Sequence, residues 1–206
     1  TKILAEWALE HDIRFIYASS AATYGDGAKG FADSHKTIPG LKPINMYGYS
    51  KQVFDLWVLR QKLESRVAGI KFFNVFGPNE YHKGDMSSVI FKAFHQIKET
   101  GKVKLFKSYK KEYKDGGQMR DFVYVKDCVN VMWWLLQNRK VNGIFNLGTG
   151  KARSWNDLIK AVFTAMKKKT NIEYIAMPEA LRNQYQYFTE AEMSKLKKAG
   201  CPFKFS

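Results

Sequence analysis

IRFIYASS, residues 13–20, is a short apolar run that ends in two consecutive serines. A helical pattern precedes it in residues 1–12, and another runs from residue 50 to about residue 66. A second apolar run, IKFFNVF at residues 70–76, comes next. Short, continuously apolar strands that alternate with helices are typical of a parallel sheet that is covered on both faces. The sequence therefore predicts an α/β protein.

The same alternation continues through the middle of the chain. Residues 86–98, MSSVIFKAFHQIK, have the apolar spacing of a helix. Apolar strands at 103–106 and 122–125 flank a loop rich in lysine, tyrosine and glycine. Residues 127–138, DCVNVMWWLLQN, predict a largely buried helix that is capped by its first residue, the aspartate. GIFNLGTG, residues 143–150, predicts a strand that ends in a glycine turn.

Two capping patterns predict further helices towards the end of the chain. Ser154 with Asp157, and Thr189 with Glu192, have the spacing of capping boxes. Gly200 predicts the end of the last helix.

The domain organisation follows from one absence. The chain has no GxxGxxG turn, which follows the first strand of a Rossmann-like, doubly wound nucleotide-binding sheet. Because the chain also begins with a helical pattern, we expect it to be a fragment in which the first strands of the sheet are missing. Residues 1–76 are expected to form the C-terminal part of the dinucleotide-binding domain. Residues 77–206 are expected to form mainly a smaller α+β substrate-binding lobe, with residues 121–150 returning to the first domain.

Composition excludes several classes of protein. The 206 residues are 45% hydrophobic and 15% aromatic, which allows a real core and argues against a disordered chain. No apolar run approaches the roughly 20 residues that span a bilayer. Cys128 and Cys201 show neither a CxxC spacing nor a metal-site spacing, so we expect a reducing, cytoplasmic setting without disulfide or metal. A net charge of +15 indicates an anionic partner, which could be nucleic acid, a membrane surface or a phosphorylated small molecule, and composition does not choose among them.

NMYGYSK, residues 45–51, sets Tyr47 and Lys51 four residues apart where a helix begins. In a helix both side chains leave the same face. An ammonium beside a phenol favours the phenolate, and a tyrosine tuned in this way can take a proton from a sugar hydroxyl. The spacing alone is weak evidence, because such pairs are common on helix surfaces.

The context of this pair strengthens the interpretation. Ser20 ends a predicted strand, and in open α/β sheets ligands bind outside the carboxyl ends of the strands. Its hydroxyl can bridge a substrate oxygen and the phenol of Tyr47. Serines after a strand also act as simple turn residues. The order of serine, then Tyr47 and Lys51, then FFNVFGP at 72–78 is one that chance rarely supplies.

This order resembles the extended short-chain dehydrogenase/reductase family, the nucleotide-sugar epimerases and dehydratases. The motifs SSAATYG, YGYSK, FNVFGP, RDFVYVKD and FNLGTG carry the resemblance over essentially the whole chain. Within the family, YASSAATYG, HKGDMSSV and YQYFT are similar to the ADP-heptose 6-epimerases, isomerases that serve the inner core of lipopolysaccharide.

The resemblance implies site residues and a tightly held NADP. Tyr47 and Lys83 would be catalytic bases on opposite sides of the sugar, with Ser20 and Lys51 as catalytic partners. Lys51, Val75 and Lys83 would contact the cofactor. The substrate, a nucleotide sugar (ADP-heptose), would be held by Asn74, Asp85, Lys92, Phe106, Lys107, Ser108, Tyr109, Arg120 and Tyr185. No nucleic acid or membrane partner is implied, and a homo-oligomer is expected.

Three other functions remain open from the sequence. A 4-epimerase or 4,6-dehydratase of another nucleotide sugar would share Ser20, Tyr47 and Lys51 but would have no use for Lys83. A nucleic-acid-binding module could use the basic KSYKKEYK segment at 107–114, in which aromatic residues alternate with lysines. A catalytically silent relative that senses a dinucleotide is disfavoured because Ser20, Tyr47 and Lys51 are all present.

Overall fold

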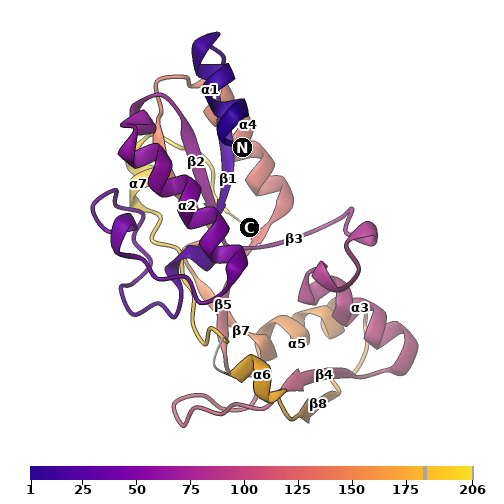
Figure 1. The fold of residues 1–206 in the computed structure, drawn as a ribbon. Helices are drawn as coiled ribbons and strands as arrows, with labels where there is room; N and C mark the ends of the chain where they lie inside the picture. Colours follow the sequence, from indigo (N-terminus) through magenta and orange to yellow (C-terminus); the bar gives the residue numbers. More distant parts are fainter. Residues whose placement is uncertain (183–184, 206) are drawn as a thin grey trace.

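The computed structural model describes residues 1–182 and 185–205, which form two groups of strands and helices (Figure 1). The first group surrounds a sheet of three parallel strands in the order β1-β2-β6. Its elements are α1 (Lys2–Glu10), β1 (Ile16–Ser20), the 3₁₀ turn η1 (Ala21–Tyr24), α2 (Met46–Arg60), β2 (Ala68–Phe72), α4 (Val125–Gln137) and β6 (Gly143–Leu147).

The ends of these three strands are aligned. Ser20 pairs in register with Phe72, and Phe72 with Leu147. The carboxyl ends of all three strands therefore meet at one edge of the sheet, which is where parallel α/β sheets place their ligands. The predicted parallel α/β sheet is confirmed.

The second group lies at the lower right of Figure 1, where β4 and β8 form a parallel pair beside α3 and α5. It contains α3 (Val89–Thr100), β4 (Val103–Phe106), α5 (Trp155–Ala165), β8 (Ile172–Ile175) and α6 (Glu179–Arg182). Between the groups run β3 (Asn74–Phe76), the 3₁₀ segment η4 (Tyr81–Met86), β5 (Met119–Tyr124) and β7 (Ala152–Ser154). β5 pairs with β3 in parallel and with β7 antiparallel.

Each group has its own hydrophobic cluster. Ile70, Val131 and Leu147 are among the buried residues of the first cluster. Ile97 and Phe163 belong to the second. The segment that carries the short helix α7 (Ser194–Lys198) returns to the first cluster through Ala191, Met193 and Leu196. The C-terminal residues therefore pack on the first sheet, although they follow the second group in the sequence.

Two predicted boundaries in the first group are wrong. The helix expected from residue 50 begins at Met46, because the side chain of Asn45 caps it by accepting a hydrogen bond from the Gly48 N–H at 2.8 Å. It ends at Arg60 and is followed by the 3₁₀ turn η3 (Leu63–Ser65). The single strand expected at 70–76 is two strands, β2 and β3, which belong to different sheets and separate at Phe73.

Of the three predicted helix caps, one is confirmed and two are wrong. Ser154 and Asp157 form the predicted capping box of α5. Asp127 does not cap α4, because Tyr124 occupies the N-cap position and Asp127 lies in the first turn. Thr189 and Glu192 open no helix, since α7 begins later and has Met193 at its N-cap.

The helix α4 is less buried than predicted. Only Cys128, Val131 and Leu135 of this helix are buried. Trp134 is half-buried, and four other large apolar side chains stay exposed: Val129, Met132, Trp133 and Leu136. Within residues 1–182 and 185–205, no helix has the length and apolarity needed to cross a membrane, and no cluster of ligating side chains suits a metal ion.

Candidate active site

Ser20 is the last residue of β1, at the carboxyl edge of the sheet. It is nearly buried, and its hydroxyl caps η1 by accepting a hydrogen bond from the Ala22 N–H at 3.1 Å. The small residues that follow allow the chain to turn tightly beneath α2. Gly48 of α2 approaches so closely that a Cβ there would lie 2.6 Å from the carbonyl oxygen of Ala22. This close packing fixes the start of α2 against the end of β1.

Tyr47 and Lys51 lie in the first two turns of α2, one turn apart. The Tyr47 side chain is 56% exposed. The Lys51 ammonium lies 5.7 Å from the centroid of the Tyr47 ring and donates a hydrogen bond to the carbonyl of Ala18 in β1 at 3.1 Å. The predicted pairing on one helix face is therefore present. An ammonium has three donors, so two donors of Lys51 remain for ligand hydroxyls.

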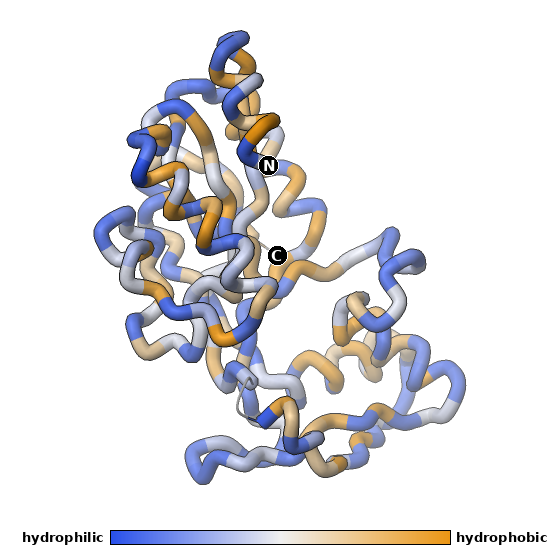
Figure 2. Tube along the Cα trace, viewed as in Figure 1, coloured by the Kyte–Doolittle hydropathy of each residue, from blue (hydrophilic) through white to orange (hydrophobic). Residues whose placement is uncertain are grey.

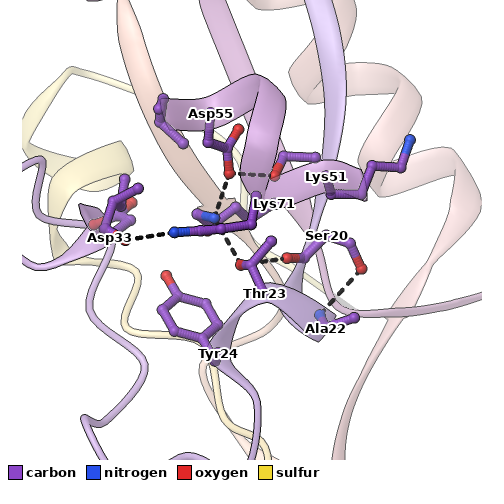
Figure 3. Close-up of polar contacts among 12 residues, drawn as sticks. Ser20, Ala22, Thr23, Tyr24, Asp33, Lys51, Asp55 and Lys71 are labelled. Carbon is purple, nitrogen blue, oxygen red and sulfur yellow. Dashed lines mark hydrogen bonds and ion pairs between the residues drawn. The ribbon is translucent and has the colours of Figure 1, made fainter. Parts of the chain in front are cut away.

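A buried polar network lies near Lys51, where α2 packs on the sheet (Figure 3). The ammonium of Lys71, in β2, lies 2.5 Å from the Asp55 carboxylate and donates to the Thr23 hydroxyl at 2.7 Å. Asp55 is on α2, four residues after Lys51, and it also accepts hydrogen bonds from the Ser19 and Tyr17 hydroxyls at 2.6 and 3.0 Å. The network joins α2, β1 and β2 where Ser20, Tyr47 and Lys51 are held.

Burial explains why Lys71 needs so many partners. Its side chain is fully buried, and burial lowers the pKa of its ammonium while Asp55 opposes that effect. The Thr23 hydroxyl extends the network to the end of β1 by donating a hydrogen bond to the Ser20 carbonyl at 2.8 Å. The Lys71–Asp55 ion pair and these hydrogen bonds thus fix the position of the end of β1 relative to α2.

Lys83 reaches the same region from η4, the segment between β3 and α3. Gly84 has φ 50° and ψ −126°, a conformation that L side chains rarely adopt, and it kinks η4 after Lys83. Glu80, which is buried, accepts hydrogen bonds from the Ser88 N–H at 2.6 Å and the Ser88 hydroxyl at 2.7 Å. Its carboxylate also lies 3.8 Å from the Lys83 ammonium.

One cavity of about 410 Å³ collects most of the predicted catalytic residues. Ser20, Tyr47, Asn74, Val75 and Lys83 all line it. They come from β1, α2, β3 and η4, so only the folded chain brings them together. Lys51 does not line this cavity.

A second cavity of about 310 Å³ lies in the lower group of elements. Three of the residues predicted to bind substrate, Lys92, Phe106 and Tyr185, line it. Trp155 and Val89 line both cavities, so the two are neighbours that share a wall. The indole N–H of Trp155 donates to the Tyr185 hydroxyl at 3.0 Å. Burial raises the pKa of the Tyr185 phenol.

The other residues predicted to bind substrate line neither cavity: Asp85, Lys107, Ser108, Tyr109 and Arg120. The Arg120 guanidinium is buried over the rings of Trp155 and Tyr185, and it donates to the Met119 carbonyl at 2.8 Å. Lys107, Ser108 and Tyr109 open the basic loop that follows β4, a mainly hydrophilic stretch in Figure 2. Asp85 is exposed on η4, and its carbonyl accepts a hydrogen bond from Lys92 at 2.6 Å.

Glu80 and Trp155 are absent from the sequence prediction, although both line the first cavity. Glu80 follows a Gly-Pro-Asn turn and has the local signature of a solvated turn residue. Trp155 follows a capping serine and has the signature of a helix start. The neighbouring residues in the sequence do not indicate that Glu80 or Trp155 lines a cavity, because the rest of the cavity wall comes from residues that are distant in the sequence.

The arrangement can move protons at a bound hydroxyl. Tyr47 and Lys83 are both able to accept or donate a proton, and Ser20 and Asn74 can orient a hydroxyl between them. Hydrophobic side chains, Val75 and Phe122 among them, line other parts of the cavity.

Two similar relatives carry the same name. The chain is 63% identical over its 206 residues to the ADP-L-glycero-D-manno-heptose-6-epimerase of Nitratidesulfovibrio vulgaris, and it spans 64% of that protein's length. It is 51% identical over 209 aligned positions to the protein of the same name from Fusobacterium nucleatum, covering 97% of this chain and 63% of the relative.

A solved structure agrees with these relatives. The crystal structure of the Helicobacter pylori ADP-L-glycero-D-manno-heptose-6-epimerase matches with a TM-score of 0.69 and 28% identity, covering 96% of this chain and 63% of that one. The family model described as the NAD dependent epimerase/dehydratase family matches residues 1–148, which is more than half of the chain. The chain therefore belongs to the NAD dependent epimerase/dehydratase family.

Proposed function

We propose that the protein inverts C6 of the heptose in ADP-D-glycero-D-manno-heptose to give ADP-L-glycero-D-manno-heptose. The observation that carries the proposal is the single cavity in which Tyr47 and Lys83 meet, one from α2 and the other from η4. A carbon without an acidic hydrogen is inverted through a carbonyl stage and return of hydrogen to the opposite face. One base cannot easily serve both orientations of the hydroxyl, and this cavity supplies two.

Each side chain then has a defined role. Tyr47 takes the proton from the C6 hydroxyl of one epimer, and Lys83 takes it from the hydroxyl of the other. Ser20 holds the oxygen beside Tyr47, and Asn74 binds neighbouring hydroxyls. Microscopic reversibility requires that each base returns its proton when the carbonyl is reduced on its own side. A general base positioned in this way typically contributes 10²–10⁴-fold in rate.

The second cavity supports a nucleotide as the carrier of the sugar. Phe106 and Tyr185 offer aromatic surface, and Lys92 offers positive charge beside it. Because this cavity shares Trp155 and Val89 with the first, a ligand can place its base in one and its sugar in the other. The net charge of +15 favours a diphosphate between them.

The residues of the first cavity fit the nicotinamide of a dinucleotide, Lys51 on α2 just outside the cavity lining fits its ribose, and we propose NADP as the form used. Lys51 would bind ribose hydroxyls through its two remaining donors, with Val75 and Lys83 beside the nicotinamide. When bound, this group supplies the acceptor and donor of the hydride at C6.

The direct test uses the protein at its full natural length. It should convert ADP-D-glycero-D-manno-heptose to the 6-epimer, and it should leave UDP-glucose and dTDP-glucose unchanged. Nuclear magnetic resonance of the product reports the configuration at each carbon. Inversion at C4, or loss of water to give a 4-keto-6-deoxy sugar, would instead establish the alternative 4-epimerase or 4,6-dehydratase activity. Cofactor released by denaturation identifies NADP or NAD.

A further inference from the structure

Glu80 is the only charged residue besides Lys83 among the described residues that line the first cavity. Tyr47, on α2, is the one other titratable group in that lining, and the cavity residues from β1, β3, α3, β5 and α5 carry no charge. His82 and Asp85 flank Lys83 in the chain but do not line the cavity. The electrostatic environment of Lys83 inside the cavity is therefore dominated by one neighbour.

The Glu80 carboxylate ties together both ends of the segment that carries Lys83. Oε1 accepts hydrogen bonds from the Gly77 N–H at 3.3 Å and the Ser88 hydroxyl at 2.7 Å, and Oε2 accepts from the Ser88 N–H at 2.6 Å. Gly77 directly follows β3, and Ser88 is the N-cap of α3. One side chain thus closes a loop of about ten residues between two fixed elements.

The carboxylate remains charged while it does this. Burial raises the pKa of Glu80, but the hydrogen bonds from Ser88 and Gly77 and the charge of Lys83 outweigh burial and bring the pKa below its ordinary value. The backbone strengthens the connection, because the Lys83 N–H donates to the Glu80 carbonyl at 3.0 Å. Lys83 is consequently held both through the backbone and through its ammonium, 3.8 Å from Oε2.

We propose that Glu80 is the positioning residue of Lys83: its buried carboxylate closes the 77–88 loop and holds the Lys83 ammonium at the wall of the cavity opposite Tyr47. The inference rests on the proposed function only where it concerns turnover. How firmly the Lys83 ammonium is held can be measured from its chemical reactivity, without any assumption about the reaction.

The first experiment measures the chemical reactivity of Lys83. Trace acylation of the full-length protein at one fixed pH, read by mass spectrometry, gives the rate at which each lysine reacts, and the Lys83 side chain is 45% exposed and so within reach of reagent. Glu80→Gln keeps the shape of the side chain but removes the charge beside Lys83. We expect the acylation rate of Lys83 to rise by about two- to three-fold, because the ammonium loses the carboxylate that holds it, and the effect is small because a partly exposed charge pair is screened by water.

The matched control lies in another ion pair. Lys102 is 2.6 Å from Glu173, and neither residue lines the first cavity. The acylation rate of Lys102 should not change in Glu80→Gln, and Glu173→Gln should raise it while leaving the rate of Lys83 unchanged. An unchanged Lys83 rate in Glu80→Gln overturns the proposal.

The second experiment uses turnover. Glu80→Gln is expected to lower kcat by 10- to 100-fold when Lys83 is present and to cost nothing further in a Lys83→Met background. An equal loss in both backgrounds would show that Glu80 acts on the fold, and it would overturn the proposal. If Lys83→Met by itself keeps parental turnover, the proposed function fails at the second base, and the labelling result still decides the role of Glu80.

Discussion

Tyr47 presents its phenol to the first cavity from the first turn of α2, and more than half of its side chain is exposed to a ligand. We predict that Tyr47→Phe lowers kcat of the full-length protein by about 10²–10⁴-fold, because the ring remains and only the proton-transferring group is lost. Bound cofactor should be retained, since the Lys51 contact to the Ala18 carbonyl does not involve the phenol. Steady-state turnover and cofactor absorbance measure both. Turnover close to that of the parent would remove Tyr47 from the mechanism.

Lys83 gives the sharper prediction, because it separates this activity from the alternatives that need only Ser20, Tyr47 and Lys51. Lys83→Met should slow oxidation of one 6-epimer far more than that of the other, since each base serves one orientation of the hydroxyl. Single-turnover oxidation of each epimer, followed by the absorbance of the reduced nicotinamide, measures the two rates. Circular dichroism should match the parent, because the side chain is half-exposed on a loop.

Equal rates for both epimers, near those of the parent, would make Lys83 an ordinary surface lysine. Lys92→Met is a suitable comparison. Lys92 lines the second cavity and donates to the Asp85 carbonyl, so its loss should raise KM for the nucleotide sugar without distinguishing the epimers.

At the scale of elements, the buried Lys71–Asp55 pair determines how α2 sits on the sheet. Breaking a buried pair leaves an uncompensated charge, which typically costs about 3–5 kcal/mol. We predict a loss of this size in the free energy of unfolding for Lys71→Met, measured by urea denaturation. Lys71→Met combined with Asp55→Asn should recover part of the loss, because no unpaired charge remains and Asn still accepts from the Ser19 or Tyr17 hydroxyl.

The control is Lys102→Met, which breaks the exposed pair with Glu173. That change should affect stability far less, because exposed pairs contribute little. A double variant no more stable than Lys71→Met alone would show that the hydrogen bonds of Asp55, and not its charge balance, hold α2 in place.

The elements also show what the sequence can and cannot predict. Short apolar runs predict β1, β4 and β6, because each run is visible in neighbouring residues of the sequence without knowledge of the strands that it pairs with. The split between β2 and β3 is not predictable in this way, since IKFFNVF is apolar throughout and only pairing with different partners divides it at Phe73. The start of α2 depends on the cap by Asn45, a residue that is equally common in turns.

The residues of the candidate site likewise divide into those that the sequence predicts and those that it does not. Ser20, Tyr47 and Lys51 are predictable because a serine at a strand end, the Tyr47–Lys51 pair and FFNVFGP follow one another in the sequence, although the Tyr47–Lys51 spacing alone is weak evidence. Glu80 and Trp155 are not, because their place in the cavity depends on β3, α3 and α5 meeting in space. Asp127 and the Thr189–Glu192 pair show the reverse error, in which a local pattern predicts a cap at the wrong residue, since Tyr124 is the N-cap of α4 and Met193 that of α7.

At the scale of the whole molecule, the first cavity lies between the two groups of elements and the second lies within the lower group, and the two cavities share Trp155 and Val89. Tyr185 strengthens the shared wall, because its hydroxyl accepts the Trp155 indole N–H. A ligand that fills both cavities would therefore bridge the two hydrophobic clusters, while a ligand confined to one would touch only the elements around it. This difference can be measured by hydrogen exchange.

We predict that ADP alone slows amide exchange around the second cavity, in residues 89–109 and 155–163, and leaves residues 45–51 and 77–84 as they are. The nucleotide sugar should slow all four segments, because its sugar reaches Tyr47 and Lys83 across Trp155. Trp155→Phe keeps an aromatic wall but loses the hydrogen bond to Tyr185, so protection of residues 45–51 by the nucleotide sugar should weaken more than protection of residues 89–109. The measurement is made on the full-length Tyr47→Phe variant, so that the sugar is not converted during labelling. Protection of residues 45–51 by ADP alone would place the nucleotide, and not the sugar, in the first cavity, and it would reverse the assignment of the two cavities.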